Sequence, residues 1–418
     1  MWDYVLKNSF RLWNVFSVLG KKGIQLIPNP NVPLPRLLRE TFEELGVTYI
    51  KLGQFIASAP SFFPEEYVME FQKCLDQTEP VPFSVIEKIL VEEFRKPLSS
   101  IFDSIEEKPI ASASIAQVHG AVLKDGTDVV LKIQKPGVKD VILTDTNFLY
   151  FAAKLFEFLV PEVERLSLSE LVEDLQKSMI NECDFILEAK HTKDFRRFLE
   201  KYQIPHATVP KIYDHLTTSR VITMERLYGV PFWDFEAVKK IVPDPKEMMI
   251  KTLTTWFLSL VENDFFHADL HSGNLMVLFD GRVAFIDFGI VGRISQKTWQ
   301  GLQKIVLAME AEPLDYLLLA EGLMQAGIAK QAISKDKFAQ DLKLAFETLQ
   351  QWDSMISEEL TEEEINKKFL KIIQVAKENG IRFPREFGLI LKQFLYFDKY
   401  LRTLAPDIRM VETMSSLE

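Results

Sequence analysis

The stretch that decides the fold is His267-Ala268-Asp269-Leu270-His271-Ser272-Gly273-Asn274, with Asp287-Phe288-Gly289 a short way downstream. Between them lie two short apolar runs, LMVLF and RVAFI, joined by an Asp-Gly pair that is typical of a tight β-hairpin. A hairpin returns the chain to the point where it began, so we expect Asn274 and Asp287 to lie close together. Phosphoryl transfer requires oxygen ligands for Mg²⁺ and a carboxylate that orients or deprotonates the nucleophile. The pattern therefore predicts a phosphate-handling centre in which Asp269 is the base or water-orienting group and Asn274 and Asp287 bind Mg²⁺.

The spacing of these residues is also that of a known catalytic arrangement. Asp269 and Asn274 fit the catalytic loop H-x-D-x-x-x-x-N of protein kinases, and Asp287 begins the metal-binding triplet D-F-G. A D-F-G triplet alone means little, whereas the ordered set with its connecting hairpin is specific. It predicts an α+β, protein-kinase-like, two-lobed fold with a mostly helical C-terminal lobe and with ATP as the nucleotide.

An alternative for the same stretch is a hydrolytic metal site, because imidazole and carboxylate are ordinary ligands of Zn²⁺ or Mn²⁺ and His267, Asp269 and His271 alternate. Such a site usually needs further ligands, and the other histidines show no clustered spacing. We therefore expect His267 to fix the backbone of the loop, and His271 to be a satisfied polar residue or a neighbour of the ligands. The remaining histidines are His119, His191, His206 and His215.

A kinase-like fold also requires a lysine on the third strand of its small lobe, where it neutralises phosphate charge. Lys132 fits, because it lies in the second of two valine-rich runs, 116–123 and 128–134, which an Asp-Gly turn predicts to be a hairpin. Two acidic residues on the helix predicted over 170–200, Glu182 and Glu188, could hold it. Being six residues apart, they do not share a helical face. We favour Glu188 as the partner of Lys132 and expect Glu182 to pair elsewhere.

The loop before the first of these strands differs from that of kinases. Kinases have glycines there, which let main-chain N–H groups approach phosphates closely, but this chain has Ala111-Ser112-Ala113-Ser114. Alanine and serine stiffen the loop, so we expect altered nucleotide handling rather than efficient peptide phosphorylation. The alternative is an ordinary turn of small residues.

Two further regions bear on the substrates. Main-chain groups of the connector that contains Glu225 and Leu227 are expected to read the adenine base, because the connector follows the strand predicted to end at Met224. A helix is predicted to begin at about Ser295, which leaves no room after Gly289 for a long activation segment. A platform for a protein substrate is therefore not expected.

Hydrophobic periodicity and proline positions predict the rest of the organisation. An N-terminal helical extension is expected over residues 1–80, a kinase-like N-terminal lobe with an antiparallel sheet over 81–226, and a C-terminal lobe over 227–418. A strand is also predicted over 208–213. Everything after Ser295 is predicted to be helical.

Composition excludes several classes of protein. The 418 residues carry a net charge of −11, which is not the footprint of a nucleic-acid-binding protein, and two cysteines cannot form a disulfide framework. No run reaches the ~18 apolar residues of a spanning helix. The helix predicted around Trp2 to Trp13 has two interpretations: it packs on the core, or it lies on a membrane surface with Lys7 and Arg11 facing lipid headgroups.

Taken together, these motifs resemble the UbiB family of atypical kinases, which support ubiquinone (isoprenoid quinone) biosynthesis. The most specific marker is Tyr49-Ile50-Lys51-Leu52-Gly53-Gln54, which matches the family's K-x-G-Q signature. Glu182-Cys183-Asp184 matches its E-x-D, and the alanine-rich loop is a further marker. The resemblance covers about residues 30–407. It implies that Lys51 and Gln54, on a helix folded over the active site, occupy space that a peptide substrate would need.

The resemblance also implies which partners the chain has. At three positions, however, the sequence departs from the pattern of the family. The resemblance implies a nucleotide, a lipid or quinone precursor, a membrane surface and quinone-biosynthesis proteins as partners, in the cytoplasm or on the matrix side of an organelle. Leu270 and Ser272 stand where the family usually has prolines, and Ser112 stands where it typically has alanine.

Two other functions stay open at this point. A nucleotide-gated scaffold would bind ATP and organise a lipid-biosynthetic complex without transferring phosphate. A small-molecule kinase of the antibiotic- or choline-phosphorylating kind would share the Asp, Asn and Asp centre. Such kinases lack the K-x-G-Q extension, so the sequence itself speaks against this second alternative.

Overall fold

The computed structural model describes residues 15, 17, 18, 33–58, 64–71, 73, 78–159, 168–262, 265–271, 273–311, 313–329, 334–353, 372, 374–376 and 378–405. Its contacts divide the chain into two compact units. Unit 1 comprises residues 1–193 and 210–226, and unit 2 comprises 194–209 and 227–418. The helix predicted around Trp2 to Trp13 lies outside the described residues. None of the helices in the described part of the chain is long and apolar enough to cross a membrane.

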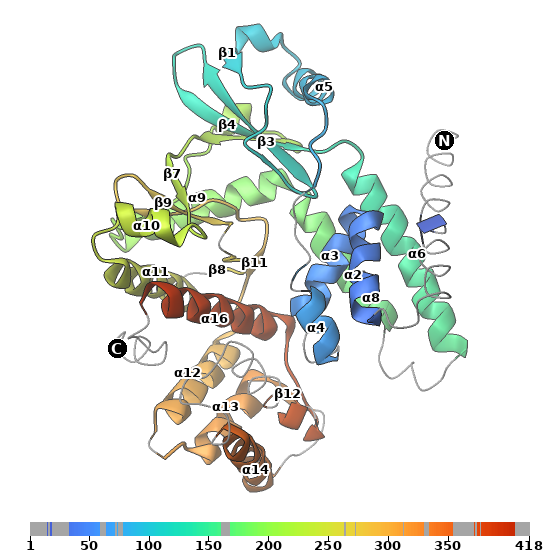
Figure 1. The fold of residues 1–418 in the computed structure, drawn as a ribbon, viewed down its shortest axis with the longest axis vertical. Coiled ribbons are helices and arrows are strands. Elements are labelled where there is room, and N and C mark those ends of the chain that lie inside the picture. Colours follow the sequence, from blue (N-terminus) through green and yellow to red (C-terminus); the bar gives the residue numbers. More distant parts are fainter. Residues whose placement is uncertain are drawn as a thin grey trace. The chain divides into compact units, whose positions relative to one another are not determined.

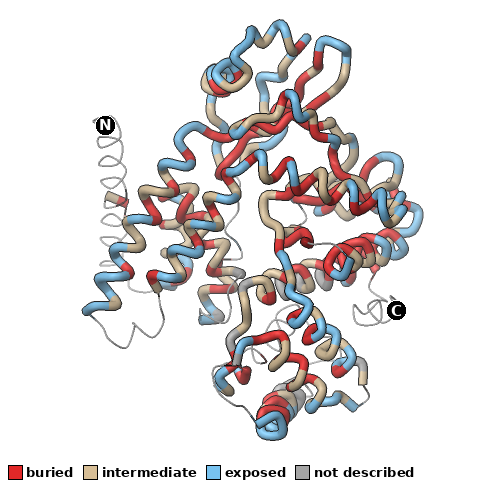
Figure 2. The backbone as a smooth tube through the Cα atoms, turned by 180° about the vertical axis from the view of Figure 1, so that it is seen from behind, coloured by how far each residue is buried: buried red, intermediate tan, exposed pale blue. Residues whose placement is uncertain are grey.

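Unit 1 contains an antiparallel sheet with the strand order β1-β3-β4-β6, and β2 pairs with β3 (Figure 1). The predicted hairpin is confirmed: Gly126 supplies the positive φ of +84° that its turn needs. Alternation along β4 sends Val129, Leu131 and Ile133 into a core beneath α5 and sends Lys132 to the opposite face. The inner strands are buried along most of their length (Figure 2). The strands are β1 (Phe102–Ile105), β2 (Ala111–Ser112), β3 (Ala116–Leu123), β4 (Asp128–Gln134) and β6 (Val221–Glu225).

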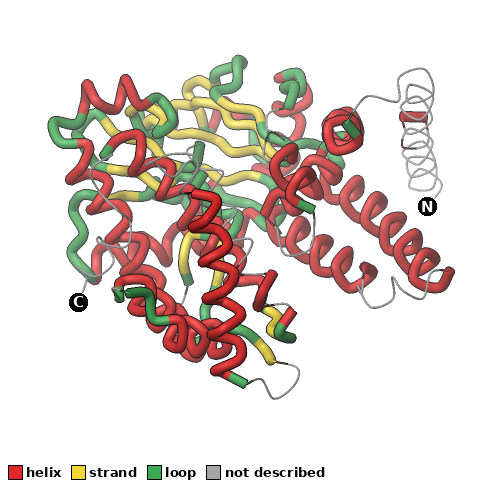
Figure 3. Tube along the Cα trace, turned by 60° about the horizontal axis from the view of Figure 1, so that its bottom comes forward, coloured by secondary structure: helices red, strands yellow, loops and turns green. Residues whose placement is uncertain are grey.

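The other elements described in unit 1 are helical. The helix α2 begins within a proline-rich stretch, with Pro35 in its first turn, because a proline in the first turn of a helix costs no hydrogen bond. The long helices α6 and α8 run side by side (Figure 3). The helices are α2 (Leu34–Leu45), α3 (Val47–Ser58), α4 (Glu65–Phe71), α5 (Phe83–Phe94), α6 (Val138–Leu159), α8 (Leu168–Glu182) and α9 (Phe185–Lys201), which ends in unit 2; the 3₁₀ turns are η1 (Leu98–Ser100) and η2 (Asp214–Leu216).

Unit 2 is mainly helical around a small sheet of order β5-β10-β9-β7, with two further strand pairs, β8 with β11 and β12 with β13. Helices α12 and α13 pack closely at Gly301, where a Cβ atom would lie 2.7 Å from the Gly322 carbonyl oxygen. The elements are β5 (Ala207–Thr208), β7 (Gly229–Pro231), β8 (Phe266–His267), β9 (Leu275–Leu278), β10 (Val283–Phe285), β11 (Val291–Gly292), β12 (Ile328–Ala329), β13 (Ile381–Arg382), α10 (Phe235–Ile241), α11 (Pro245–Glu262), α12 (Gln296–Glu310), α13 (Tyr316–Ala326), α14 (Lys335–Asp353) and α16 (Arg385–Leu404).

Two predictions of strands and helices were wrong in detail. The strand predicted over 208–213 is only β5, because Pro210 has no N–H for a ladder, and Ile212 forms an isolated bridge with Met224. The region after Ser295 is not wholly helical, since it contains the short pair β12 and β13. The helix predicted to begin near Ser295 is confirmed, because Ser295 is the N-cap of α12 and its side chain accepts from Thr298.

Candidate active site

Asp269 lies in a loop whose backbone is fixed from several directions. The strand β8 pairs with β11, and the Ala268 N–H donates to the Ile290 carbonyl at 3.2 Å. His267 is buried, and its Nδ1 accepts the Asp269 N–H at 3.2 Å, so it holds the loop as predicted. Burial lowers the pKa of His267 to about 4, against the opposing pull of the Asp269 and Asp287 carboxylates. The imidazole is therefore neutral at physiological pH.

The β9–β10 hairpin brings Asn274 and Asp287 to the same end of unit 2, as predicted. Leu275 pairs with Phe285, and one step further the Ile286 N–H donates to the Asn274 carbonyl at 3.0 Å. The Asn274 Nδ2 donates to the Asp269 carbonyl at 2.9 Å, which leaves the Asn274 Oδ1 as the atom able to bind a cation. One Asp287 oxygen, Oδ1, accepts the Gly289 N–H at 2.9 Å, which orients the carboxylate.

The donor atoms fit Mg²⁺ better than a transition metal. Asn274 and Asp287 offer oxygens, and Mg²⁺ binds one or two carboxylates and completes its shell with water and substrate phosphates. His271 uses its Nδ1 to accept the Gly273 N–H at 3.0 Å, and its Nε2 lies 3.8 Å from the Asp269 carboxylate. Among the described residues no group of three or more His, Cys, Asp and Glu side chains could hold a metal.

Unit 1 holds the predicted lysine. The Lys132 Nζ lies 2.6 Å from the Glu188 Oε1, and the side chains keep only 13% and 5% of their exposure. The Phe185 ring lies 5.5 Å from the Lys132 Nζ. Glu188 is in the first turn of α9, where the Asp184 carboxylate accepts the Leu187 N–H at 3.0 Å. The favoured pairing with Glu188 is present, and Asp184 helps to place it by capping the helix.

The helix α3, which carries the K-x-G-Q motif, forms an ion pair with α8. The Lys51 Nζ lies 2.8 Å from the Glu182 Oε2 at the end of α8, and both side chains are nearly buried. Glu182 and Glu188 thus serve different lysines, as expected, but the single helix predicted over 170–200 was wrong. The chain breaks after Glu182 and α9 begins at Phe185, so the two glutamates lie on different helices. Gln54 is half-buried on α3, and its role stays a prediction.

The alanine-rich loop is held by residues that sequence reasoning missed. Ala111 and Ser112 form β2, and the Thr78 hydroxyl donates to the Ala113 carbonyl at 2.7 Å. The Lys135 ammonium donates to the Thr78 hydroxyl at 2.6 Å. Ser114 is buried, and the Ser112 hydroxyl is buried without a hydrogen-bond partner in the described part of the chain. No local signal marks Thr78, which lies far from the loop in sequence.

In the connector expected to contact the adenine base, Glu225 already forms hydrogen bonds within the protein. The Glu225 N–H donates to the Lys211 carbonyl at 2.8 Å, and the Glu225 side chain accepts the Lys211 N–H at 3.0 Å. The division between the two units falls directly before Leu227. The reading of adenine by Glu225 and Leu227 stays a prediction.

Comparison with known proteins adds the family. The sequence profile of the ABC1 atypical kinase-like domain matches residues 73–315, which is more than half of the chain. The chain belongs to the ABC1 atypical kinase-like family. The resemblance to UbiB proteins expected from the sequence is confirmed, because relatives of this ABC1 chain are named UbiB.

Two relatives and one solved structure illustrate the match. A chloroplastic aarF domain-containing protein kinase of Arabidopsis thaliana, itself uncharacterized, is 45% identical over 90% of this chain and 73% of its own length. A probable protein kinase UbiB of Shewanella baltica is 30% identical over 98% of this chain and 74% of its own length. The Mycobacterium tuberculosis protein Rv3197, solved in complex with erythromycin, aligns with a TM-score of 0.53 at 22% identity, over 86% of this chain and 89% of its own. The predicted α+β, kinase-like fold is thereby confirmed.

Proposed function

We propose that this ABC1 protein is an ATP-binding atypical kinase or ATPase, in which Asn274 and Asp287 bind Mg²⁺ and Asp269 orients or deprotonates the attacking nucleophile. The observation that carries the proposal is the bonding at one end of the β9–β10 hairpin. There the side-chain amide of Asn274 donates a hydrogen bond to the Asp269 carbonyl. The main-chain carbonyl of Asn274 accepts the N–H of Ile286, the residue before Asp287.

Each side chain has a distinct task in this proposal. Mg²⁺, when bound, would neutralise charge on the phosphate oxygens. Asp269 would accept a proton from, or align, the hydroxyl or water that attacks. Lys132 would contact phosphate oxygens, as the lysine on the third strand of a kinase does, and its ion pair with Glu188 holds the ammonium group in place.

The alanine-rich loop supports altered nucleotide handling rather than efficient peptide phosphorylation. Its main chain is committed to β3, and Thr78 and Lys135 tie it to the segment before α5. A loop held in this way cannot adapt to phosphates as freely as a glycine loop does.

Thermal unfolding with Mg²⁺ and ATP tests the nucleotide site. A ligand at 100 times its Kd adds about 2.7 kcal/mol to the native state, so the wild type should show a clear magnesium-dependent shift. Asp287→Asn should lose most of the shift. Asp269→Asn should keep it and lower ATP turnover by about 10²–10⁴-fold.

Asp280→Asn is a matched control, because Asp280 lies at the turn of the same hairpin and contacts only Arg282 among the bonds described there. It should leave both binding and turnover unchanged. A wild type without a magnesium-dependent shift would contradict the nucleotide site, and equal loss of binding in Asp269→Asn and Asp287→Asn would contradict the roles.

We further propose that this activity serves isoprenoid quinone biosynthesis, on the strength of the UbiB-named relatives. Complementation of a strain that lacks its own UbiB protein tests this, with quinone content as the readout. Restoration by the wild type and by Asp269→Asn alike would favour the nucleotide-gated scaffold. Restoration by the wild type alone would favour the enzyme.

A further inference from the structure

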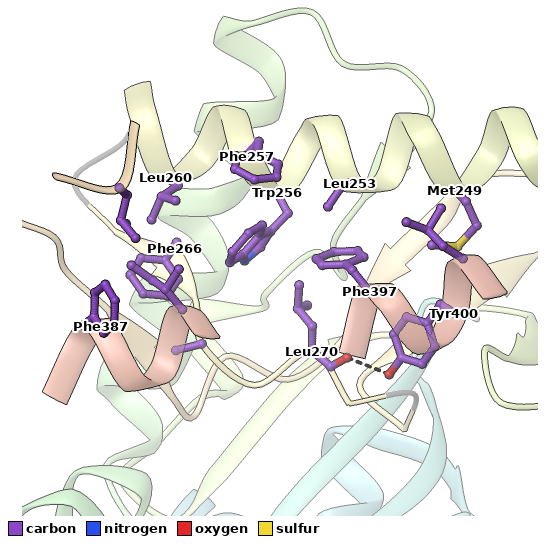
Figure 4. Close-up of a cluster of buried hydrophobic side chains, with 14 of the residues drawn as sticks. Met249, Leu253, Trp256, Phe257, Leu260, Phe266, Leu270, Phe387, Phe397 and Tyr400 are labelled. Atoms are coloured by element: carbon purple, nitrogen blue, oxygen red, sulfur yellow. Dashed lines mark hydrogen bonds between the residues drawn. The ribbon is translucent and has the colours of Figure 1, made fainter. Parts of the chain in front are cut away.

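Two polar side chains of α16 contact the loop that carries Asp269. The Gln393 Oε1 accepts the Leu270 N–H at 2.7 Å, and the Gln393 Nε2 donates to the Ala268 carbonyl at 2.7 Å. The Tyr400 hydroxyl donates to the Leu270 carbonyl at 2.9 Å (Figure 4). These contacts join segments more than a hundred residues apart within unit 2.

The surroundings of Gln393 are those of a core. Gln393 has no exposed surface, and Tyr400 keeps 2%. Phe397 lies between them on the same helix and packs on Trp256, with ring centroids 5.4 Å apart (Figure 4). A buried amide is costly unless its hydrogen bonds are made. Here both donors are used, the second one on the Leu389 carbonyl at 3.0 Å, so the site is built for an amide.

The two hydrogen bonds of Gln393 lie on either side of Asp269 along the chain. The Ala268 carbonyl belongs to the peptide plane before Asp269, and the Leu270 N–H belongs to the plane after it. One amide therefore contacts both planes, whose orientations set φ and ψ of Asp269. The other atoms of these planes are held by His267 and Asn274, which bond the Asp269 N–H and the Asp269 carbonyl.

Leu270 is part of the same arrangement. A proline at this position would have no N–H to donate. In this chain the leucine supplies the donor that the Gln393 oxygen accepts, while its side chain is fully buried.

We propose that Gln393, supported by Tyr400, is a positioning residue for Asp269: it fixes the two peptide planes that aim the carboxylate, and it does so from α16. The inference rests on the proposed role of Asp269 in phosphoryl chemistry. It predicts that loss of Gln393 impairs turnover and leaves Mg-ATP binding intact, because Asn274 and Asp287 are held by the β9–β10 hairpin instead.

Steady-state kinetics of ATP turnover by the full chain test the proposal. Gln393→Met keeps length and volume but removes both bonds, and it should lower kcat by about 10²-fold, as a misplacement of about 1 Å does. The KM for ATP and the magnesium-dependent thermal shift should stay as in the wild type. Leu270→Pro removes one donor and should lower kcat by less.

Phe397→Leu is the control for packing, because it weakens the packing of the same helix and its apolar side chain makes no hydrogen bond to the loop. A double variant separates positioning from stability: in the Asp269→Asn background, Gln393→Met should change kcat by less than about threefold, because it acts through the missing carboxylate. An equal kcat loss for Gln393→Met and Phe397→Leu, or a full additional loss in the double variant, would overturn the proposal.

Hydrogen exchange keeps the test independent of turnover. Gln393→Met should speed exchange of the Asp269 and Leu270 amides while exchange in α11 stays slow, and Phe397→Leu should not produce this local pattern. If the wild type turns over no ATP, the proposed function fails and the exchange result alone decides the positioning. Unchanged exchange at these two amides would overturn it.

Discussion

The ion pair between Lys132 and Glu188 allows a sharp prediction about unit 1. The charged atoms lie 2.6 Å apart, and the side chains keep 13% and 5% of their exposure, so the pair is largely removed from water. Loss of one partner of such a pair leaves a buried charge and costs about 3–5 kcal/mol. We therefore expect Glu188→Gln to lower the free energy of unfolding of unit 1 by about 3 kcal/mol.

The assay is thermal unfolding without nucleotide. A unit of this size loses about 2–4 °C of Tm per kcal/mol, so Glu188→Gln should unfold about 6–12 °C below the wild type. Lys132→Met should behave similarly, because it leaves the Glu188 carboxylate buried. Glu173→Gln, on the exposed face of α8, is the matched control and should change the free energy of unfolding by less than about 0.5 kcal/mol.

The double variant Lys132→Met with Glu188→Leu distinguishes stability from function. Replacing a buried pair with apolar residues is often neutral or stabilising, so the double variant should recover most of the lost Tm while Mg-ATP binding stays weakened. Single variants that unfold within about 2 °C of the wild type would refute the reasoning, because the pair would then be solvated.

Two further predictions concern local features. Because burial holds the pKa of His267 at about 4 against its ordinary 6.5, the unfolded chain takes up one more proton between these values, and stability present above pH 6.5 is lost as the pH falls toward 4. His267→Gln should therefore flatten the fall in unfolding free energy over that window by about 3 kcal/mol in urea titrations; an unchanged slope would contradict the burial of a neutral ring. Asp184→Ala removes the N-cap of α9 and should cost about 1 kcal/mol and raise the KM for ATP, with Asp184→Asn as the control that keeps an acceptor oxygen; equal KM values for both variants and the wild type would show that the cap does not place Glu188.

Much of the fold was readable from the sequence because its signals are local. The two hairpins follow from Asp-Gly turns between apolar runs, and both formed with the expected partners. The same hairpin logic placed Asn274 beside the residue before Asp287. The sequence predicted different partners for Glu182 and Glu188, and the structure contains two separate ion pairs. The reason differs from the predicted one, because the two glutamates lie on separate helices, α8 and α9.

The sequence did not reveal the residues that hold the two loops of the candidate site. Thr78 and Lys135 anchor the alanine-rich loop, and Gln393 and Tyr400 anchor the loop of Asp269. No sequence pattern near these four residues indicates that they make these contacts. A buried amide that satisfies two peptide planes is recognisable only once the chain has brought distant segments together. By itself the sequence determined which atoms could do chemistry, since motifs and turns depend on neighbours along the chain. Only the tertiary structure decided how those atoms are aimed, because hydrogen bonds and buried charges depend on neighbours in space.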